Sequence, residues 1–279
     1  MSMNLPHIDC TAQTTQITAF IKSTLKAAGK QTAAIALSGG IDSAVSLALT
    51  VKALGLDHVH PLHLPTRLSN PLHTKDVELL LKSLDFPTAG LSTINIGSII
   101  QKTWRTINRN STNAPSGTPD RKAHNAEVTK HNRLRLANLS ARIRMMVLYD
   151  FAKQHDALVI GTENYSEHLL GYFTRFGDEA SDVEPIRHLY KTQVIELAKH
   201  LNIPHEIITK PPSADLWQGQ TDENEMGFSY QEADPILYLH DQGQSEAEIV
   251  SSGIDAKLVS AVLATVAKND YKQNVPYKM

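Results

Sequence analysis

The stretch that decides the fold runs from residue 32 to residue 54 and reads Thr-Ala-Ala-Ile-Ala-Leu, then Ser-Gly-Gly-Ile-Asp-Ser, then Ala-Val-Ser-Leu-Ala-Leu-Thr-Val-Lys-Ala-Leu. Its first six residues are a short apolar run, which is typical of a parallel strand buried on both faces. Residues 42–54 instead place apolar side chains at helical spacing and end at Gly55. The stretch therefore predicts a buried strand, a tight turn and a helix.

The same alternation recurs along the chain. Helical spacing covers residues 14–28, 74–84, 97–107, 136–155, 190–201 and the tail from Tyr230 onward, while apolar runs predict strands at 58–64, 91–96 and 157–161. Strands that alternate with helices build a parallel sheet covered on both faces. We expect a doubly wound α/β fold with a small helical C-terminal part.

The predicted elements fit one domain over residues 1–279, with an α/β core over 14–210 and a loop and helical part over 211–279. A polar segment, 105–134, interrupts the core and is nearly free of large apolar side chains, so it cannot pack a core of its own. Two interpretations stay open for it: a loop that orders over a ligand, and a solvated insertion.

Composition narrows the class of protein. Of the 279 residues 41% are hydrophobic and 20% charged, and the formal net charge is −2, so no field attracts polyanions and nucleic acid is not an expected partner. No window is apolar enough to cross a bilayer, and we expect a cytoplasmic protein without membrane contact. Cys10 is the single cysteine, so an internal disulfide is excluded, and we interpret it as an inert thiol.

The turn at residues 38–43 has the composition of an anion site. Backbone N–H groups at the start of a helix meet the positive end of its dipole, Gly39 and Gly40 allow close approach, and Ser38 and Ser43 add hydroxyls. The turn lacks the lysine of a Walker loop. Asp42 would repel a triphosphate unless Mg²⁺ lay between them, although an acidic residue also favours a helix start by itself.

Ser-Gly-Gly-Ile-Asp-Ser resembles the loop of the ATP pyrophosphatase superfamily. That resemblance implies cleavage of ATP between its α and β phosphates, an adenylate intermediate, and a loop that grips the departing pyrophosphate. The loop by itself sets the reaction class and leaves the substrate open.

Later blocks are similar to the NAD⁺ synthetase family, and with the loop they extend the resemblance from about Thr32 to Lys272 outside the polar segment. They are residues 161–178, then Asp182, Pro185 and residues 189–193, and further on residues 211–216, 219–223 and 227–230. The resemblance implies an enzyme, an amide-forming ligase. It would adenylate the nicotinate carboxylate of deamido-NAD⁺ with ATP and amidate it with ammonia, giving NAD⁺, AMP and pyrophosphate.

The resemblance also implies four sets of site residues. The catalytic residues would be Asp178, Lys191 and Asp42. ATP would contact Ser38, Gly39, Gly40, Asp42, Ser43, Thr162, Lys191 and Ser213. Deamido-NAD⁺ would contact Arg142, Tyr172, Phe173, Arg175, Asp182 and Lys272. Mg²⁺ would be held by Asp42 and Glu167.

Some positions depart from the family or allow a second interpretation. Arg175 stands where the family more often has lysine, which keeps the charge and changes the hydrogen-bond geometry. Tyr271 stands where the family usually has histidine, so the resemblance assigns it no contact with substrate. Tyr172 and Phe173 suit stacking on the nicotinate ring and suit core packing equally well.

The resemblance further implies a homodimer and free ammonia as the nitrogen source, since the chain has no room for a glutaminase domain with its catalytic cysteine. Two alternatives stay open. Another enzyme of the superfamily, such as a tRNA-modifying one, would need a basic RNA-binding face. A nucleotide-binding sensor that has lost catalysis would have no need of Asp42, Glu167, Lys191 and Asp178 together.

Overall fold

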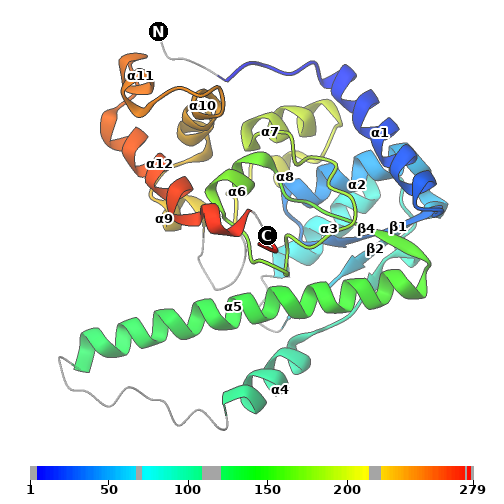
Figure 1. The fold of residues 1–279 in the computed structure, drawn as a ribbon. Helices are drawn as coiled ribbons and strands as arrows, with labels where there is room; N and C mark the ends of the chain where they lie inside the picture. The colour runs from blue at the N-terminus through cyan, green and yellow to red at the C-terminus, as the bar shows by residue number, and fades with distance from the viewer. Residues whose placement is uncertain (1–4, 67–70, 109–120, 214–220, 274, 278–279) are drawn as a thin grey trace.

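The computed structural model describes residues 5–66, 71–108, 121–213, 221–273 and 275–277 (Figure 1). Its strands are β1 (Thr32–Leu37), β2 (Val59–His63), β3 (Ser92–Thr93) and β4 (Ala157–Ile160). They form one parallel sheet in the order β3-β2-β1-β4. Beyond β4, Val183 pairs with Ile160 in an isolated parallel bridge. The predicted parallel sheet is confirmed.

The helices account for most of the remaining described chain. They are α1 (Cys10–Ala27), α2 (Ile41–Leu54), α3 (Pro71–Ser83), α4 (Gly97–Asn108), α5 (Arg121–Gln154), α6 (Tyr165–Leu170), α7 (Lys191–His200), α8 (His205–Ile208), α9 (Asp222–Met226), α10 (Tyr230–Asp241), α11 (Glu246–Ser251) and α12 (Ala256–Asn269), with short 3-10 turns at Leu56–His58, Thr88–Gly90 and Asp270–Lys272.

Helices cover both faces of the sheet, as a doubly wound fold requires (Figure 1). Alternate side chains of β1 point to opposite faces: Ala33, Ile35 and Leu37 pack with α1, α2, α3, α7 and α8. On the other face Ala34 packs with α4 and α5. A strand buried on both sides needs a continuous apolar run, which is why the sequence pattern at residues 32–37 matches the bounds of β1.

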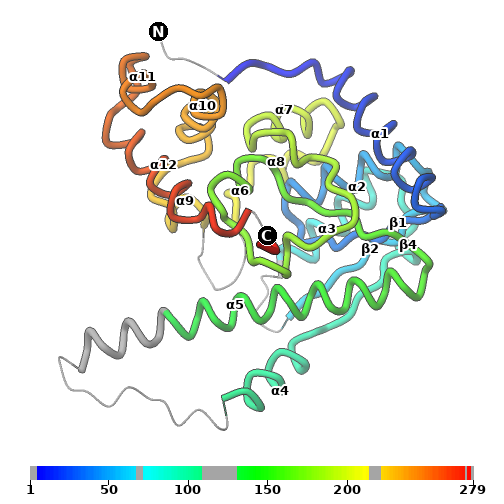
Figure 2. The backbone as a smooth tube through the Cα atoms, viewed as in Figure 1, coloured from blue at the N-terminus to red at the C-terminus, as the bar shows by residue number. Residues whose placement is uncertain are grey.

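The C-terminal helices form a separate apolar cluster. Helices α10, α11 and α12 pack on one another and against Leu170 of α6. Figure 2 traces this group beside α6 and away from the sheet. The small helical C-terminal part is therefore as predicted.

The polar segment differs from expectation at both of its ends. Residues 105–108 belong to α4, and residues 121–134 open the 34-residue helix α5. No proline or glycine occurs between Arg121 and Gln154, so the helix nucleated by the packed second half of α5 continues without a break. The loop interpretation is wrong for these ends, and residues 109–120 lie outside the described residues.

Two further boundaries differ. Helix α1 begins at Cys10 rather than near residue 14, because Asp9 caps it by accepting hydrogen bonds from the N–H groups of Thr11 and Ala12. The strand expected over 91–96 pairs only at Ser92 and Thr93, since β3 is an edge strand with β2 as its partner. None of the described helices is both long and apolar enough to cross a membrane.

Candidate functional site

The loop at residues 38–43 leaves β1 and turns directly into α2. The Ser38 hydroxyl accepts a hydrogen bond from the Gly40 N–H at 3.2 Å and lies 3.2 Å from the Ser43 hydroxyl. Gly39 has a φ of 77°, and a Cβ at this position would lie 2.8 Å from the carbonyl oxygen of His73. The predicted tight turn at the positive end of a helix dipole is therefore present.

Three charged side chains from three helices converge beside this loop. The Lys191 ammonium, at the start of α7, donates to Asp42 Oδ2 at 2.6 Å and to Glu167 Oε1 at 2.9 Å. Asp42 lies in the first turn of α2 and Glu167 in the first turn of α6. The structure thus brings together three residues that the family resemblance had singled out, and we call Asp42, Glu167 and Lys191 the charged triad.

Asn164 forms hydrogen bonds with two members of the charged triad. Its side-chain amide donates to Asp42 Oδ1 at 2.9 Å, and its Oδ1 accepts from the Glu167 N–H at 3.0 Å, so it caps α6 and orients Asp42 at once. Asn164 was not predicted as a site residue. Its position three residues before Glu167, where a helix cap belongs, was the available signal.

The buried carboxylate of Asp234 hydrogen-bonds to residues that neighbour Glu167 and Lys191 in the chain. Asp234 of α10 is 0% exposed and accepts hydrogen bonds from the Ser166 hydroxyl at 2.5 Å and from the Thr192 N–H and hydroxyl at 2.8 and 2.7 Å. Ser166 in turn accepts from the Lys191 N–H at 2.9 Å. Asp234 therefore fixes the starts of α6 and α7, and its isolated place in an apolar helix pattern gave no sequence signal.

Opposing effects set the pKa values of the triad. Burial lowers the pKa of Lys191, which is 2% exposed, but Asp42 and Glu167 outweigh it and the pKa is raised overall. Burial and the charge of Asp42 raise the pKa of Glu167 to about 8, against the opposing effect of Lys191. Two carboxylates share one ammonium, so further positive charge at this point is favourable.

The triad fits a divalent cation shared with a phosphate. Its two carboxylates already converge on one cationic group, and they provide the oxygen donors that Mg²⁺ prefers. Among the described residues no group of three or more His, Cys, Asp or Glu side chains surrounds a common point. Mg²⁺ commonly takes one or two carboxylates and completes its shell with water and substrate phosphates, which matches this donor set.

A second group of residues gathers on the loop that follows α6. The Lys272 ammonium donates to the carbonyls of Gly171 and Phe173 at 2.5 and 3.1 Å and lies 5.4 Å from the Phe173 ring centre. The Arg175 guanidinium lies over the Tyr271 ring at 5.1 Å. This loop and the last turn of the chain thus form one unit.

Arg142 of α5 joins that unit, since its Nε donates to the Arg175 carbonyl at 3.2 Å. Asp178 lies in the same loop and accepts from the Thr174 N–H at 3.0 Å. The residue is exposed, yet the surrounding protein raises the pKa of its carboxyl, against the opposing Thr174 hydrogen bonds and the charge of Lys272.

The remaining predicted residues lie at more scattered places. Thr162 is half-buried just beyond β4, and Ser213 is exposed. Tyr172 donates its hydroxyl to Glu225 of α9 at 2.5 Å. Asp182 accepts from the Val159 N–H at 2.8 Å and from the Tyr149 hydroxyl at 3.4 Å, so its carboxylate ties β4 to α5.

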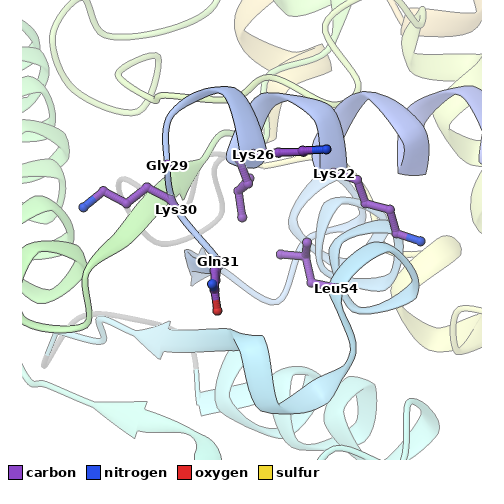
Figure 3. A pocket seen from close by; sticks show the side chains of 7 residues that line it. Lys22, Lys26, Gly29, Lys30, Gln31 and Leu54 are labelled. Atoms are coloured by element: carbon purple, nitrogen blue, oxygen red, sulfur yellow. The ribbon is translucent and has the colours of Figure 1, made fainter.

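A lysine-rich pocket lies at the opposite end of β1 from the loop at residues 38–43. It is lined by Lys22, Leu25, Lys26, Gly29, Lys30, Gln31 and Leu54. Figure 3 shows the ammonium groups of Lys22 and Lys30 pointing away from each other, and Lys30 is already paired with Asp156. The lysines do not converge, so the pocket does not form part of the site.

Known proteins are similar to this chain over most of its length. The model of the NAD synthase family matches residues 13–276. The NH(3)-dependent NAD(+) synthetase of Fusobacterium nucleatum is 36% identical over 262 residues, which cover 94% of this chain and 92% of that protein.

Two solved structures are also similar. The NMN synthetase of Francisella tularensis has a TM-score of 0.79 and 31% identity, with 98% of this chain and 99% of that chain covered. The NH3-dependent NAD synthetase of Campylobacter jejuni, in complex with the nitrate ion, has a TM-score of 0.74 and 30% identity, with 98% and 100% covered. With the family model matching nearly its whole length, this chain belongs to the NAD synthase family.

Proposed function

We propose that this enzyme makes NAD⁺ in two steps, adenylation of the nicotinate carboxylate of deamido-NAD⁺ by ATP and displacement of AMP by ammonia. The observation that carries the proposal is the charged triad beside the loop at 38–43, where Lys191 Nζ lies 2.6 Å from Asp42 Oδ2. A carboxylate does not react usefully with ammonia, so ATP must first supply a leaving group. The reported relatives are synthetases, which favours this reaction over tRNA modification or a sensor role.

ATP would lie across the loop with its phosphates against Ser38, Gly39, Gly40 and Ser43. The N–H groups at the start of α2 and the two serine hydroxyls are suited to the pyrophosphate that departs. Thr162 and Ser213 would complete the contacts, since Thr162 follows β4 at the same edge of the sheet.

Asp42 and Glu167 would hold Mg²⁺, which supplies positive charge against the phosphates when bound. Lys191 then has a fixed position from which its ammonium stabilises the charge that develops as pyrophosphate leaves. Because Ser166 and Asp234 fix the backbone at the start of α7, this lysine costs little reorganisation during the reaction.

The dinucleotide would lie along the loop after α6. Arg142, Arg175 and Lys272 carry the positive charge that its phosphates need, and Phe173 or Tyr172 would stack on the nicotinate ring. Asp182 would contact the dinucleotide, and its carboxylate also accepts a hydrogen bond from the Val159 N–H of β4. Asp178, whose carboxyl has a raised pKa, would accept a proton from ammonium.

We further infer that the enzyme works as a homodimer in the cytoplasm and takes free ammonia. Sedimentation of the purified protein measures the assembly directly. A monomer at assay concentrations that makes NAD⁺ at full rate would contradict the dimer while leaving the reaction itself standing.

The reaction is tested by incubating the protein with deamido-NAD⁺, ATP, Mg²⁺ and ammonium. We expect NAD⁺ and AMP in equal amounts, with pyrophosphate. Formation of ADP, or the absence of NAD⁺, would overturn the proposal. The same assay with nicotinate mononucleotide is informative, because the Francisella relative is named for a mononucleotide. A higher kcat/KM for the mononucleotide would reassign the substrate within the same chemistry.

A further inference from the structure

The aromatic ring of Tyr230 contacts the Lys191 ammonium from the C-terminal part of the chain. Lys191 Nζ lies over this ring, 5.2 Å from its centre, which is within the distance at which an aromatic face attracts a cation. Tyr230 is the first residue of α10, and its exposed fraction is 2%, the same as that of Lys191. The contact is therefore desolvated, and a cation–π attraction is strongest in that setting.

The position of the Tyr230 ring is fixed by the start of α10. Ser229 caps this helix, since its hydroxyl accepts from the Glu232 N–H while the Glu232 carboxylate accepts from the Ser229 N–H. The ring packs in the apolar cluster of the C-terminal helices, and its hydroxyl donates to Asp222 Oδ2 at 3.3 Å. Burial raises the pKa of this hydroxyl well above its usual range, so the ring is uncharged near neutral pH.

The other partners of the Lys191 ammonium are the two proposed magnesium ligands. An ammonium group has three N–H donors, and in the described part of the chain they reach two acceptors, Asp42 Oδ2 and Glu167 Oε1. These carboxylates attract the ammonium less strongly once they also bind Mg²⁺. The Tyr230 ring keeps its attraction for the ammonium, because Mg²⁺ takes oxygen ligands and does not compete for an aromatic face.

We propose that Tyr230 is a positioning residue, which holds the Lys191 ammonium beside the loop at residues 38–43 when Asp42 and Glu167 bind Mg²⁺. The inference rests on the proposed function and adds a residue that acts through Lys191. An aromatic face attracts a cation without carrying a negative charge of its own. The ammonium can therefore be held in place and still stabilise the negative charge of the departing pyrophosphate.

The first test compares Tyr230→Leu with Tyr230→Phe. Tyr230→Leu should lower kcat about tenfold or more, as loss of a desolvated cation–π contact implies. The KM for deamido-NAD⁺ should stay within about twofold, because Arg142 and Lys272 belong to a separate unit. Tyr230→Phe keeps the ring and should restore most of the lost kcat. Equal losses in the two variants would refute a role for the ring.

Phe228→Leu is the matched control for loss of packing. Phe228 is 5% exposed and belongs to the same apolar cluster as Tyr230, so its replacement also removes a buried aromatic ring. This variant should keep the kcat of the wild type when the two are compared at equal amounts of folded protein. An equal fall of kcat in Phe228→Leu and Tyr230→Leu would show that packing, and not the contact with Lys191, controls the rate.

Fluorinated phenylalanines at position 230 separate the electrostatics of the ring from its shape, and they decide the question even if Tyr230→Leu fails to fold. Each fluorine withdraws electron density from the ring face and weakens its attraction for a cation, while the size of the ring changes little. We expect kcat to fall stepwise from phenylalanine to its monofluoro, difluoro and trifluoro forms. A kcat that does not depend on the number of fluorine atoms would refute the proposal.

A crystal structure with Mg²⁺ and the ATP analogue that has a methylene group between its α and β phosphates gives a readout apart from activity. Lys191 Nζ should lie within about 6 Å of the Tyr230 ring centre in that complex. An ammonium withdrawn from the ring would refute the inference.

Exchange of labelled pyrophosphate into ATP, with deamido-NAD⁺ and no ammonia, separates this inference from the proposed function. A wild-type protein without that exchange refutes the proposed function. A wild type that exchanges pyrophosphate, together with a Tyr230→Leu variant of full kcat, refutes only the role of Tyr230.

Discussion

Lys191 Nζ lies 2.6 Å from Asp42 Oδ2, although the two residues are 149 positions apart in the chain. The fold produces this contact because α2 and α7 both start at the carboxyl edge of the sheet. Ligands of open parallel sheets bind at that edge, so the contact lies where a bound nucleotide is expected.

Replacing Lys191 with methionine should lower kcat by about 100-fold or more, since a fixed cation at a developing negative charge is lost. The KM for deamido-NAD⁺ should change little, because the Arg142 and Lys272 unit is separate from α7. Release of AMP measures the rate. Lys199→Met is the control, because Lys199 lies on the same helix and is exposed, and it should keep full activity. Equal losses in both variants would argue against a specific role.

Gly39→Ala should damage both stability and ATP binding. The residue has a φ of 77°, and a Cβ there would lie 2.8 Å from the His73 carbonyl oxygen, so the backbone of the loop must shift. Gly29→Ala is a matched control, because Gly29 has a φ of 67° and open space around its Cβ position.

In Gly29→Ala only backbone strain is added, which should lower the free energy of unfolding by about 1 to 2 kcal/mol. Gly39→Ala should lose more and should also raise the KM for ATP. Urea unfolding and ATP titration measure the two effects. If the two variants behaved alike in both, close packing at Gly39 would be unimportant.

The sequence predicted the parts of the fold that local pattern controls. The run at 32–37 and the helix after it were placed within one residue, because a doubly buried strand needs unbroken apolar character. Asp42 and Glu167 were predicted to share a metal ion, and Lys191 to contact ATP phosphate, from the loop, the family resemblance and the rule that ligands lie at the carboxyl edge. The ion pairs that join Lys191 to both carboxylates are seen only in the structure.

Other features depend on tertiary contacts that no local pattern records. Asp234 is one aspartate in an apolar helix, and only the packing of α10 on α6 and α7 shows that it supports Lys191. Residues 121–134 are polar, yet they continue α5 because the packed half of the helix propagates into them.

Stability should depend on the charge state of Glu184. Burial raises the pKa of its carboxyl from 4.5 to about 7, so the folded state binds this proton more tightly than the unfolded chain does. The protonated group stabilises the fold below pH 4.5, and this contribution is lost as the pH rises to about 7. The unfolding temperature of the wild type, minus that of Glu184→Gln, should therefore fall across this range and then level off.

Glu248 provides a control of opposite sign. Hydrogen bonds from Ser245 lower the pKa of this exposed carboxyl, so its contribution is present above 4.5 and is lost as the pH falls. The difference between the wild type and Glu248→Gln should rise with pH and stay small, because the group is solvated. If the unfolding temperature of the wild type, minus that of Glu184→Gln, rose with pH, the fold would stabilise the ionised form of the Glu184 carboxyl.

Lys210 should act as a positioning residue for the phosphate loop. Its ammonium donates to the Gly39 carbonyl at 3.1 Å and to Asp76 Oδ2 at 2.7 Å, which ties the loop to α3. Lys210→Met should raise the KM for ATP about tenfold, as loss of a charged hydrogen bond implies, with a smaller change in kcat. In a double-mutant cycle Asp76→Asn should add little to Lys210→Met, because both changes break one contact. Lys82→Met, at an exposed site on α3, should bind ATP normally. Additive effects of Lys210→Met and Asp76→Asn would mean that the lysine contacts ATP by itself and does not act through the loop.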